Sequence, residues 1–306
     1  MTAPKTATEQ AASSRPLEGI LWMALTTVLF VGMDSIAKSL TLDYPVNQIT
    51  WGRFTFHALF IALYLNVRLP AMLKSQCLGL QTFRSCFMLA TNFLFFAGLT
   101  WLALAEVTAI MYVTPLITTL LSVPILGEQV GWRRMLSVLA GLIGAVVIIR
   151  PGGESFTWAL VLPLCAALTH SGYQLTTRLV ARRDPALTTL CYTAIVGMVV
   201  SSLALPLGWT DPDLSGWLRL AALGFIGCLG HFTFIKAFTA ANAAVVAPFG
   251  YLTLLWATAM GFLLFHELPD LWTFVGAAII AGSGLYILHR ERAKKRKPLA
   301  AWRPSR

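Results

Sequence analysis

The sequence contains few charged residues: Asp, Glu, Lys and Arg make up 12% of 306 residues, whereas 57% are hydrophobic. Soluble domains carry roughly a quarter charged residues, so this apolar excess cannot be enclosed in an ordinary core. The five cysteines form no CxxC pair, and we interpret them as small buried hydrophobes. No stretch alternates in the manner of an outer-membrane barrel strand. The chain is therefore predicted to be an all-α membrane protein.

Motifs for catalysis and for nucleotide-driven work are also missing. His266-Glu267 begins like HExxH, but Asp270 stands where the second histidine would be. There is no GxSxG elbow and no P-loop, so we do not expect ATP to drive work through this chain. We predict that the protein is not an enzyme and that it uses no cofactor and no resident metal.

Apolar stretches of about 20 residues recur along the chain, and about 20 helical residues cross a hydrocarbon core of about 30 Å. We predict ten such spans. They cover residues 18–41, 46–66, 78–100, 104–125, 130–149, 157–180, 186–207, 216–239, 243–265 and 270–289.

The basic residues are distributed unevenly among the predicted loops. With the N-terminus inside, 16 of the 23 Lys and Arg residues fall in inside segments, and only Arg150 and Arg219 fall in outside loops. We therefore predict a multi-pass protein of the cell inner membrane with both termini cytoplasmic. Residues 1–16 are predicted to form a short tail. Residues 291–306 form a basic tail that is expected to contact anionic lipid, not nucleic acid.

The two halves of the sequence align when one is shifted by 139 or 140 residues. Asn92 then falls on His231, and Tyr112 falls on Tyr251. Because each copy has five spans, the second must enter the membrane from the opposite side, and basic loop residues occur where a copy faces the cytoplasm. Inverted repeats allow two similar bundles to expose a central site to each side in turn, which favours a transporter.

Several local features have a familiar pattern: Arg53 in the second span, the Pro-Leu within Tyr112–Leu116, Gly127-Glu128, and the glycine-rich fifth span. With these features the halves resemble EamA domains of the drug/metabolite transporter (DMT) superfamily, over nearly all of residues 18–290. The segments at 236–238 and 247–251 are similar to the S-adenosylmethionine-transporter-like branch. The resemblance implies two inverted five-helix EamA repeats, at residues 17–150 and 156–290.

The resemblance implies secondary active transport of a small polar or amphipathic metabolite by alternating access. The solute would be an amino acid or derivative, or a compound like S-adenosylmethionine or riboflavin. One alternative is an exporter of amino acids or of an amino-acid-derived metallophore. An alternative of another class is a channel or a membrane-embedded sensor. The expected partners are the small-molecule substrate and the lipid bilayer, and the protein is expected to be a monomer or a homodimer.

Charged residues inside the spans need a partner or a wet cavity. Asp34 and Lys38 are four residues apart on the first span, so they either pair with each other or couple transport to an ion. Arg53 lies too deep to reach the interface, and it suits a solute carboxylate or Asp34. Arg84 lies nearer a span boundary, where its side chain is expected to reach the interface.

Polar and aromatic residues in the middle of spans complete the predicted site, although packing between helices is the competing interpretation of the aromatic rings. Pro115 and Pro248 interrupt the fourth and ninth spans and are predicted to let them bend during gating. The residues predicted to bind substrate are Arg53, Asn92, Tyr112, His231, Tyr251 and Trp256.

Overall fold

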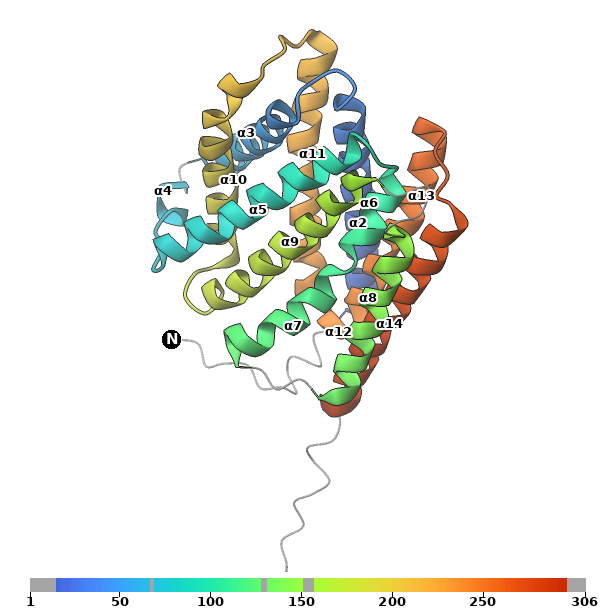
Figure 1. Cartoon of the computed structure of the whole chain (residues 1–306). Coiled ribbons are helices and arrows are strands. Elements are labelled where there is room, and N and C mark those ends of the chain that lie inside the picture. Colours follow the sequence, from blue (N-terminus) through green and yellow to red (C-terminus); the bar gives the residue numbers. More distant parts are fainter. Residues whose placement is uncertain (1–14, 67–68, 128–130, 151–156, 296–306) are drawn as a thin grey trace, which may run out of the picture.

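The computed structural model describes residues 15–66, 69–127, 131–150 and 157–295, and every regular element within them is helical (Figure 1). The predictions for residues 1–14, 128–130 and 296–306 lie outside these ranges. The elements in chain order are α2 (Pro16–Leu40), α3 (Val46–Leu65), α4 (Leu69–Met72), α5 (Leu78–Leu99), α6 (Leu104–Met111), α7 (Thr114–Leu126), α8 (Trp132–Ile149), η2 (Trp158–Leu160), α9 (Val161–Val180), α10 (Ala186–Leu203), η3 (Leu205–Leu207), α11 (Leu214–Ala240), α12 (Ala243–Val246), η4 (Ala247–Tyr251), α13 (Leu252–Phe265) and α14 (Leu271–Lys295).

Each predicted span corresponds to one helical segment among the described residues. The fourth is divided into α6 and α7, and the ninth into α12, η4 and α13. In the described part of the chain, six segments are long and apolar enough to cross a membrane by length and composition, and neither α3 nor α9 is among them. These two helices carry Arg53, His57, His170 and Gln174, whose polar side chains lower their mean hydropathy. The structure therefore confirms an all-helical chain with membrane-spanning helices, while the full number of ten crossings stays a prediction.

The last helix is longer than predicted. It continues to Lys295, past the expected end at residue 289. Arg and Lys are good helix formers, so the helix extends into the basic segment, where hydropathy alone placed its end at the last apolar residue.

Prolines mark the breaks in the fourth and ninth segments. Pro115 lies in the first turn of α7, and Pro248 lies in the first turn of η4. Proline fits the first turn of a helix because the missing N–H would have no partner there in any case. The interruptions thus occur at the predicted residues, whereas bending during gating stays a prediction.

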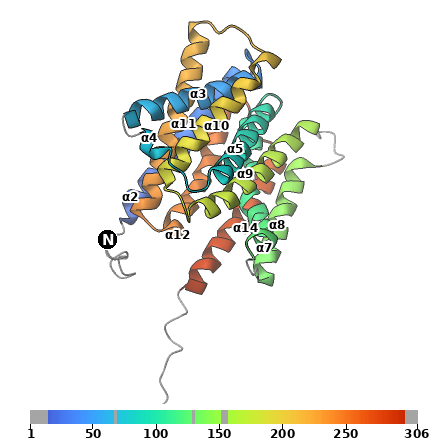
Figure 2. The same ribbon diagram turned by 90° about the vertical axis from the view of Figure 1, so that its left-hand side faces the viewer.

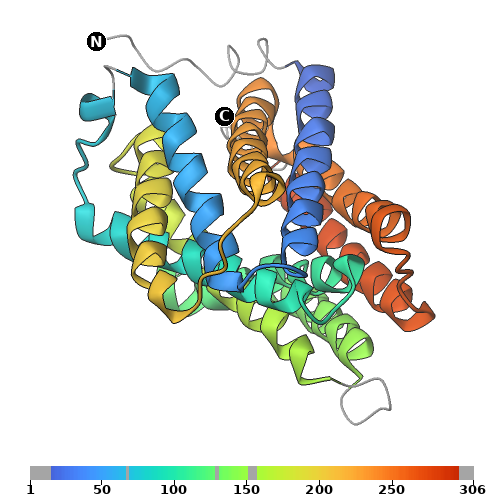
Figure 3. The same ribbon diagram turned by 90° about the horizontal axis from the view of Figure 1, so that it is seen from above.

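The packing of the helices has the same pattern in both halves. Helix α2 packs against α11 and α13, and α9 packs against α5 and α7. Figure 1 shows α5, α9 and α7 side by side, and Figure 3 shows α2 beside α11. Helices α2, α11 and α13 form one group of three, and α9, α5 and α7 form the other. In the repeat alignment each helix of the first group corresponds to the helix at the same place in the second. The members of the pairs α3 with α10 and α8 with α14 correspond to each other, and Figure 2 shows α3 beside α10. Each group of three therefore combines helices from both repeats.

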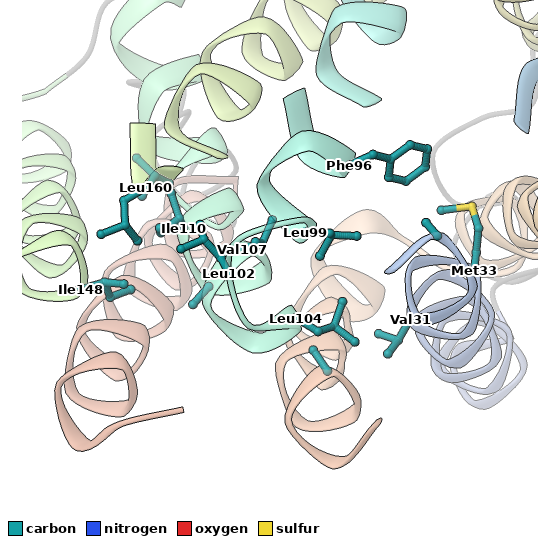
Figure 4. Close-up of a cluster of buried hydrophobic side chains, with 14 of the residues drawn as sticks. Val31, Met33, Phe96, Leu99, Leu102, Leu104, Val107, Ile110, Ile148 and Leu160 are labelled. Carbon is teal, nitrogen blue, oxygen red and sulfur yellow. The ribbon is translucent and has the colours of Figure 1, made fainter. Parts of the chain in front are cut away.

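A buried hydrophobic cluster fixes the turn between α5 and α6 against the neighbouring helices. Leu99, Leu104 and Val107 are at most 2% exposed and belong to the same buried cluster as Val31 of α2 (Figure 4). The cluster also includes Ile148 and Leu160, which come from the ends of α8 and η2. This apolar contact holds one end of the bundle together and leaves the polar residues for its centre.

Helices α8 and α14 approach closely at two glycines, which gives a first prediction. A Cβ atom on Gly144 would lie 2.9 Å from the Gly276 carbonyl oxygen and 2.9 Å from Ile280 Cγ1. We expect Gly144→Ala to lower the unfolding free energy by about 1–3 kcal/mol, because the backbone must shift. Gly282→Ala, on the same pair of helices, has no atom within 4 Å of the added carbon and is the control. Thermal unfolding in detergent measures both, and equal melting temperatures would contradict the prediction.

Candidate functional site

Arg53 and His57 lie on one face of α3 and are both buried, at 2% exposed. Residues four apart in a helix share a face, so the two side chains extend into the same region. The Arg53 Nε and both ring nitrogens of His57 have no hydrogen-bond partner among the described residues. Buried polar groups are normally paired, so this face of α3 is a candidate ligand-binding surface.

His231 of α11 lies against the same region. Its ring centroid is 5.5 Å from that of His57, and Phe30 of α2 packs edge-on against it at 5.3 Å. The structure thus brings His231, a predicted site residue, close to His57, which the sequence reasoning did not select. The available signal was that His57 is an ionisable residue in an apolar span, one helical turn after Arg53.

Asp34 of α2 faces the same centre. Its carboxylate interacts electrostatically with the Arg53 guanidinium. Within the described part of the chain, however, no ion pair within 4.0 Å joins Asp34 to Arg53 or to Lys38. An acid and a base therefore share a low-dielectric region without direct contact.

The expected pair between Asp34 and Lys38 is not formed. Lys38 Nζ instead lies 2.8 Å from Glu267 Oε2 and donates a hydrogen bond of 2.7 Å to the Leu102 carbonyl oxygen. Its side chain is 8% exposed and lies over the Phe265 ring. The ammonium is thus held by two acceptors from other segments, the Glu267 carboxylate beyond the end of α13 and the Leu102 carbonyl in the α5–α6 turn.

A second ion pair lies close to Glu267 in the sequence. Arg150 pairs with Asp270, which also accepts a hydrogen bond of 2.8 Å from the Thr273 backbone N–H at the start of α14. These pairs link α2, α8 and the α13–α14 turn, and they leave Asp34 as the acidic group of the centre.

Arg84 does not reach the interface, contrary to the expectation from its place in the sequence. It is 2% exposed, and its guanidinium donates to Thr177 Oγ1 at 2.7 Å and to Thr193 Oγ1 at 2.8 Å. It also donates to Tyr173 Oη at 2.8 Å and lies over that ring. Arg84 therefore joins α5 to α9 and α10, and its donors are occupied in a way that those of Arg53 are not.

Tyr112 and Tyr251, at equivalent positions of the two repeats, meet at the helix breaks. Their rings are stacked with centroids 4.9 Å apart and planes 24° apart. The Tyr112 hydroxyl donates a 2.5 Å hydrogen bond to the Gly250 carbonyl oxygen. The pair connects the broken fourth segment to the broken ninth, where a change in either break would separate the rings.

The other two predicted residues have different environments. Asn92 is 6% exposed and donates to the Met88 carbonyl oxygen of its own helix at 2.8 Å. Trp256 packs against the main hydrophobic cluster, and its indole Nε1 has no partner within the described chain. Asn92 is thus occupied locally, whereas Trp256 retains a free donor.

A carboxylate outside the spans ties the start of α5 to the α9–α10 turn. Asp184 is 6% exposed and accepts hydrogen bonds from Ser75 Oγ at 2.5 Å, the Gln76 backbone N–H at 2.9 Å and Gln81 Nε2 at 2.8 Å. Burial raises the pKa of Asp184, but these donors stabilise the charged form more strongly and hold the pKa at about 2. The contact joins the two repeats at the end of the bundle opposite Lys38.

An apolar helical bundle with unpaired polar groups at its centre is typical of a polytopic membrane protein with an internal binding site. The chain belongs to the EamA-like transporter family, whose model matches residues 17–150 and again residues 157–288. This confirms the resemblance found in the sequence. The protein is accordingly a membrane transporter and not an enzyme.

Relatives cover nearly the whole chain. The S-adenosylmethionine uptake transporter of Rickettsia conorii is 30% identical over 283 residues, covering 90% of this chain and 94% of that protein. The riboflavin transporter of Vibrio cholerae is 28% identical over 288 residues, covering 92% and 96%. The pseudopaline exporter CntI of Pseudomonas aeruginosa is 24% identical over 267 residues, covering 86% and 93%.

A solved structure described only as a protein crystal structure has the same fold. It matches with a TM-score of 0.61 at 21% identity and covers 92% of this chain and 99% of that one. At this identity the likeness concerns the fold alone.

Proposed function

We propose that the protein is a secondary transporter of the cell inner membrane that moves a small polar or amphipathic metabolite by alternating access. The observation that carries this proposal is the separation of Asp34 from Arg53 in the buried centre, with the Arg53 Nε unpartnered. Unpaired charges in a low-dielectric site are costly. A zwitterionic solute would neutralise both, with its carboxylate on Arg53 and its ammonium on Asp34.

Aromatic groups extend the proposed site towards the helix breaks. The stacked rings of Tyr112 and Tyr251 and the free indole N–H of Trp256 offer apolar faces and one donor. Aromatic faces bind flat and cationic groups well. These residues would hold the larger part of an amphipathic solute, with Arg53 holding its acidic end.

The alternating mechanism is supported by the exchange of packing between the halves. The group α2, α11 and α13 and the group α9, α5 and α7 have equivalent contacts. Two groups of similar structure can exchange conformations and so open a shared site first to one side and then to the other. In this proposal ten spans form two inverted repeats with both termini cytoplasmic, and Pro115 and Pro248 permit the bending.

The named relatives support a metabolite as the solute. They comprise transporters for S-adenosylmethionine and riboflavin and an exporter of pseudopaline. S-adenosylmethionine has the carboxylate and ammonium that the separated charges would bind, whereas riboflavin has neither, so we propose the amino-acid-derived compound as the better probe.

Counterflow in proteoliposomes tests the proposal. Vesicles preloaded with unlabelled S-adenosylmethionine, methionine or riboflavin are given trace labelled solute outside, and a carrier accumulates the label transiently. We expect saturable counterflow with S-adenosylmethionine and a smaller signal or none with riboflavin. Flux that rises linearly with concentration would instead indicate a channel. Absence of counterflow with all three solutes, with protein-free vesicles as the baseline, would refute the proposal for these solute classes.

A further inference from the structure

The centre contains two imidazoles from different repeats whose polar atoms have no role in the proposed solute contacts. The ring centroids of His57 on α3 and His231 on α11 are 5.5 Å apart, with their planes 32° apart. Both ring nitrogens of His57 are buried and without a hydrogen-bond partner among the described residues. His57 itself is 2% exposed, so bulk water is not adjacent.

A neutral imidazole has one donor nitrogen and one acceptor nitrogen, and each unsatisfied buried group costs about 1–3 kcal/mol. Ring nitrogens lie at the ring edge, so a small rotation can bring one nitrogen of each ring within hydrogen-bond range. An added proton can be shared between the rings, because an imidazolium N–H of one ring donates to the unprotonated nitrogen of the other, and a bound solute can accept from a remaining N–H. The described residues contain no cluster of three His, Cys, Asp or Glu side chains that could hold a metal, so a metal does not account for the pair.

The charges around the pair are mainly positive. Arg53 lies on α3 itself, Arg84 faces His231 from α5, and the third imidazole, His170, faces it from α9. The carboxylate of Asp34 faces the centre from α2, and α10, which packs against α3, has no Asp, Glu, Lys or Arg. A proton added to the pair would therefore need a further negative charge beside Arg53.

We propose that His57 and His231 form a proton-binding pair that couples one proton to the anionic group of the transported solute. This rests on the proposed function and assigns the coupling ion to the same site. The proton comes from the aqueous phase, forms an N–H bond on one imidazole lone pair, and leaves to water after the solute has gone. The solute carboxylate beside Arg53 stabilises the imidazolium, and the imidazolium stabilises the carboxylate, so each favours the binding of the other.

Two transport assays, both with tritiated S-adenosylmethionine, distinguish proton coupling from solute transport itself. Counterflow moves no net proton, whereas accumulation driven by an alkaline interior requires coupling. With one proton per solute, a gradient of one pH unit is expected to raise the accumulation ratio about tenfold. His57→Gln should bring that ratio close to one while measurable counterflow remains. His266→Gln, in the α13–α14 turn, should leave both modes unchanged.

Failure of the coupling and failure of the proposed function give different results. Wild-type counterflow without gradient-driven accumulation would overturn the coupling and leave the carrier intact. If no counterflow occurs, imidazole ¹⁵N spectra of the intact protein test the pair without any solute. Because the His57 and His231 rings are in contact, replacing His57 with Gln should shift the His231 ring-nitrogen signals, whereas His266→Gln should not. Identical His231 signals in the wild-type protein and in His57→Gln would overturn the pair.

Discussion

Arg53→Met should lower saturable uptake of S-adenosylmethionine by about 30-fold or more, measured as initial rate over solute concentration in proteoliposomes. Arg53 is 2% exposed, and its Nε has no hydrogen-bond partner within the described chain. Its positive charge and this donor are therefore available to a bound carboxylate. Removing one member of a buried, hydrogen-bonded charge pair costs about 2–5 kcal/mol, and each 1.4 kcal/mol is a factor of ten in affinity. The loss should appear mainly as weaker binding.

Two control variants make this result specific. Arg53→Lys keeps the charge but loses the fork of donors, so it should recover part of the uptake. Arg219→Gln removes a guanidinium whose side chain is 30% exposed and paired with Asp43 at 2.8 Å. Surface pairs contribute little, so uptake should stay within about twofold of the wild type. If Arg53→Met folds and retains uptake at that same level, Arg53 does not contact the solute.

The helices could be predicted from the sequence because apolar length is a local property. The C-terminal ends of α5 and α13 fall within one residue of the ends of the predicted spans, and the breaks fall at Pro115 and Pro248. Local rules were less reliable where polar contacts decide the outcome. Helix α3 carries Arg53 and His57, so its hydropathy is low although its sequence context predicts a span. The end of α14 also differs, since helix propensity continues past the apolar residues.

Site residues related by the internal repeat could be predicted from the sequence. Site contacts between segments far apart in the chain could not. The alignment of Tyr112 with Tyr251 identified two residues that stack in the structure. Spacing along one helix predicted that Asp34 and Lys38 either pair with each other or couple transport to an ion, and the Lys38 side chain instead pairs with Glu267 of another segment. Likewise His57 meets His231 only because α3 packs against α11, a contact that neither residue reveals alone.

Asp184→Ala should lower the unfolding free energy by about 2–4 kcal/mol, because its removal leaves the donors of Ser75, Gln76 and Gln81 with poorer partners. In detergent this is a fall of roughly 5–10 °C in the melting temperature. Asp43→Ala is the matched control: Asp43 lies in the corresponding turn of the other repeat, but its side chain is 51% exposed. Its loss should cost no more than about 1 kcal/mol.

The dependence on pH distinguishes the charge of Asp184 from its shape. Its folded pKa of about 2 lies below the ordinary 3.8, so the stability it provides is complete above about pH 4 and is lost as the pH falls through about 2. Asp184→Asn keeps the shape without the charge, and its stability should change less than that of the wild type in this window. Because the carboxylate joins the start of α5 to the α9–α10 turn, loss of the charge should also loosen the contact between the repeats. Parallel pH profiles for the wild type and Asp184→Asn would mean that neutral hydrogen bonds alone hold this end of the bundle.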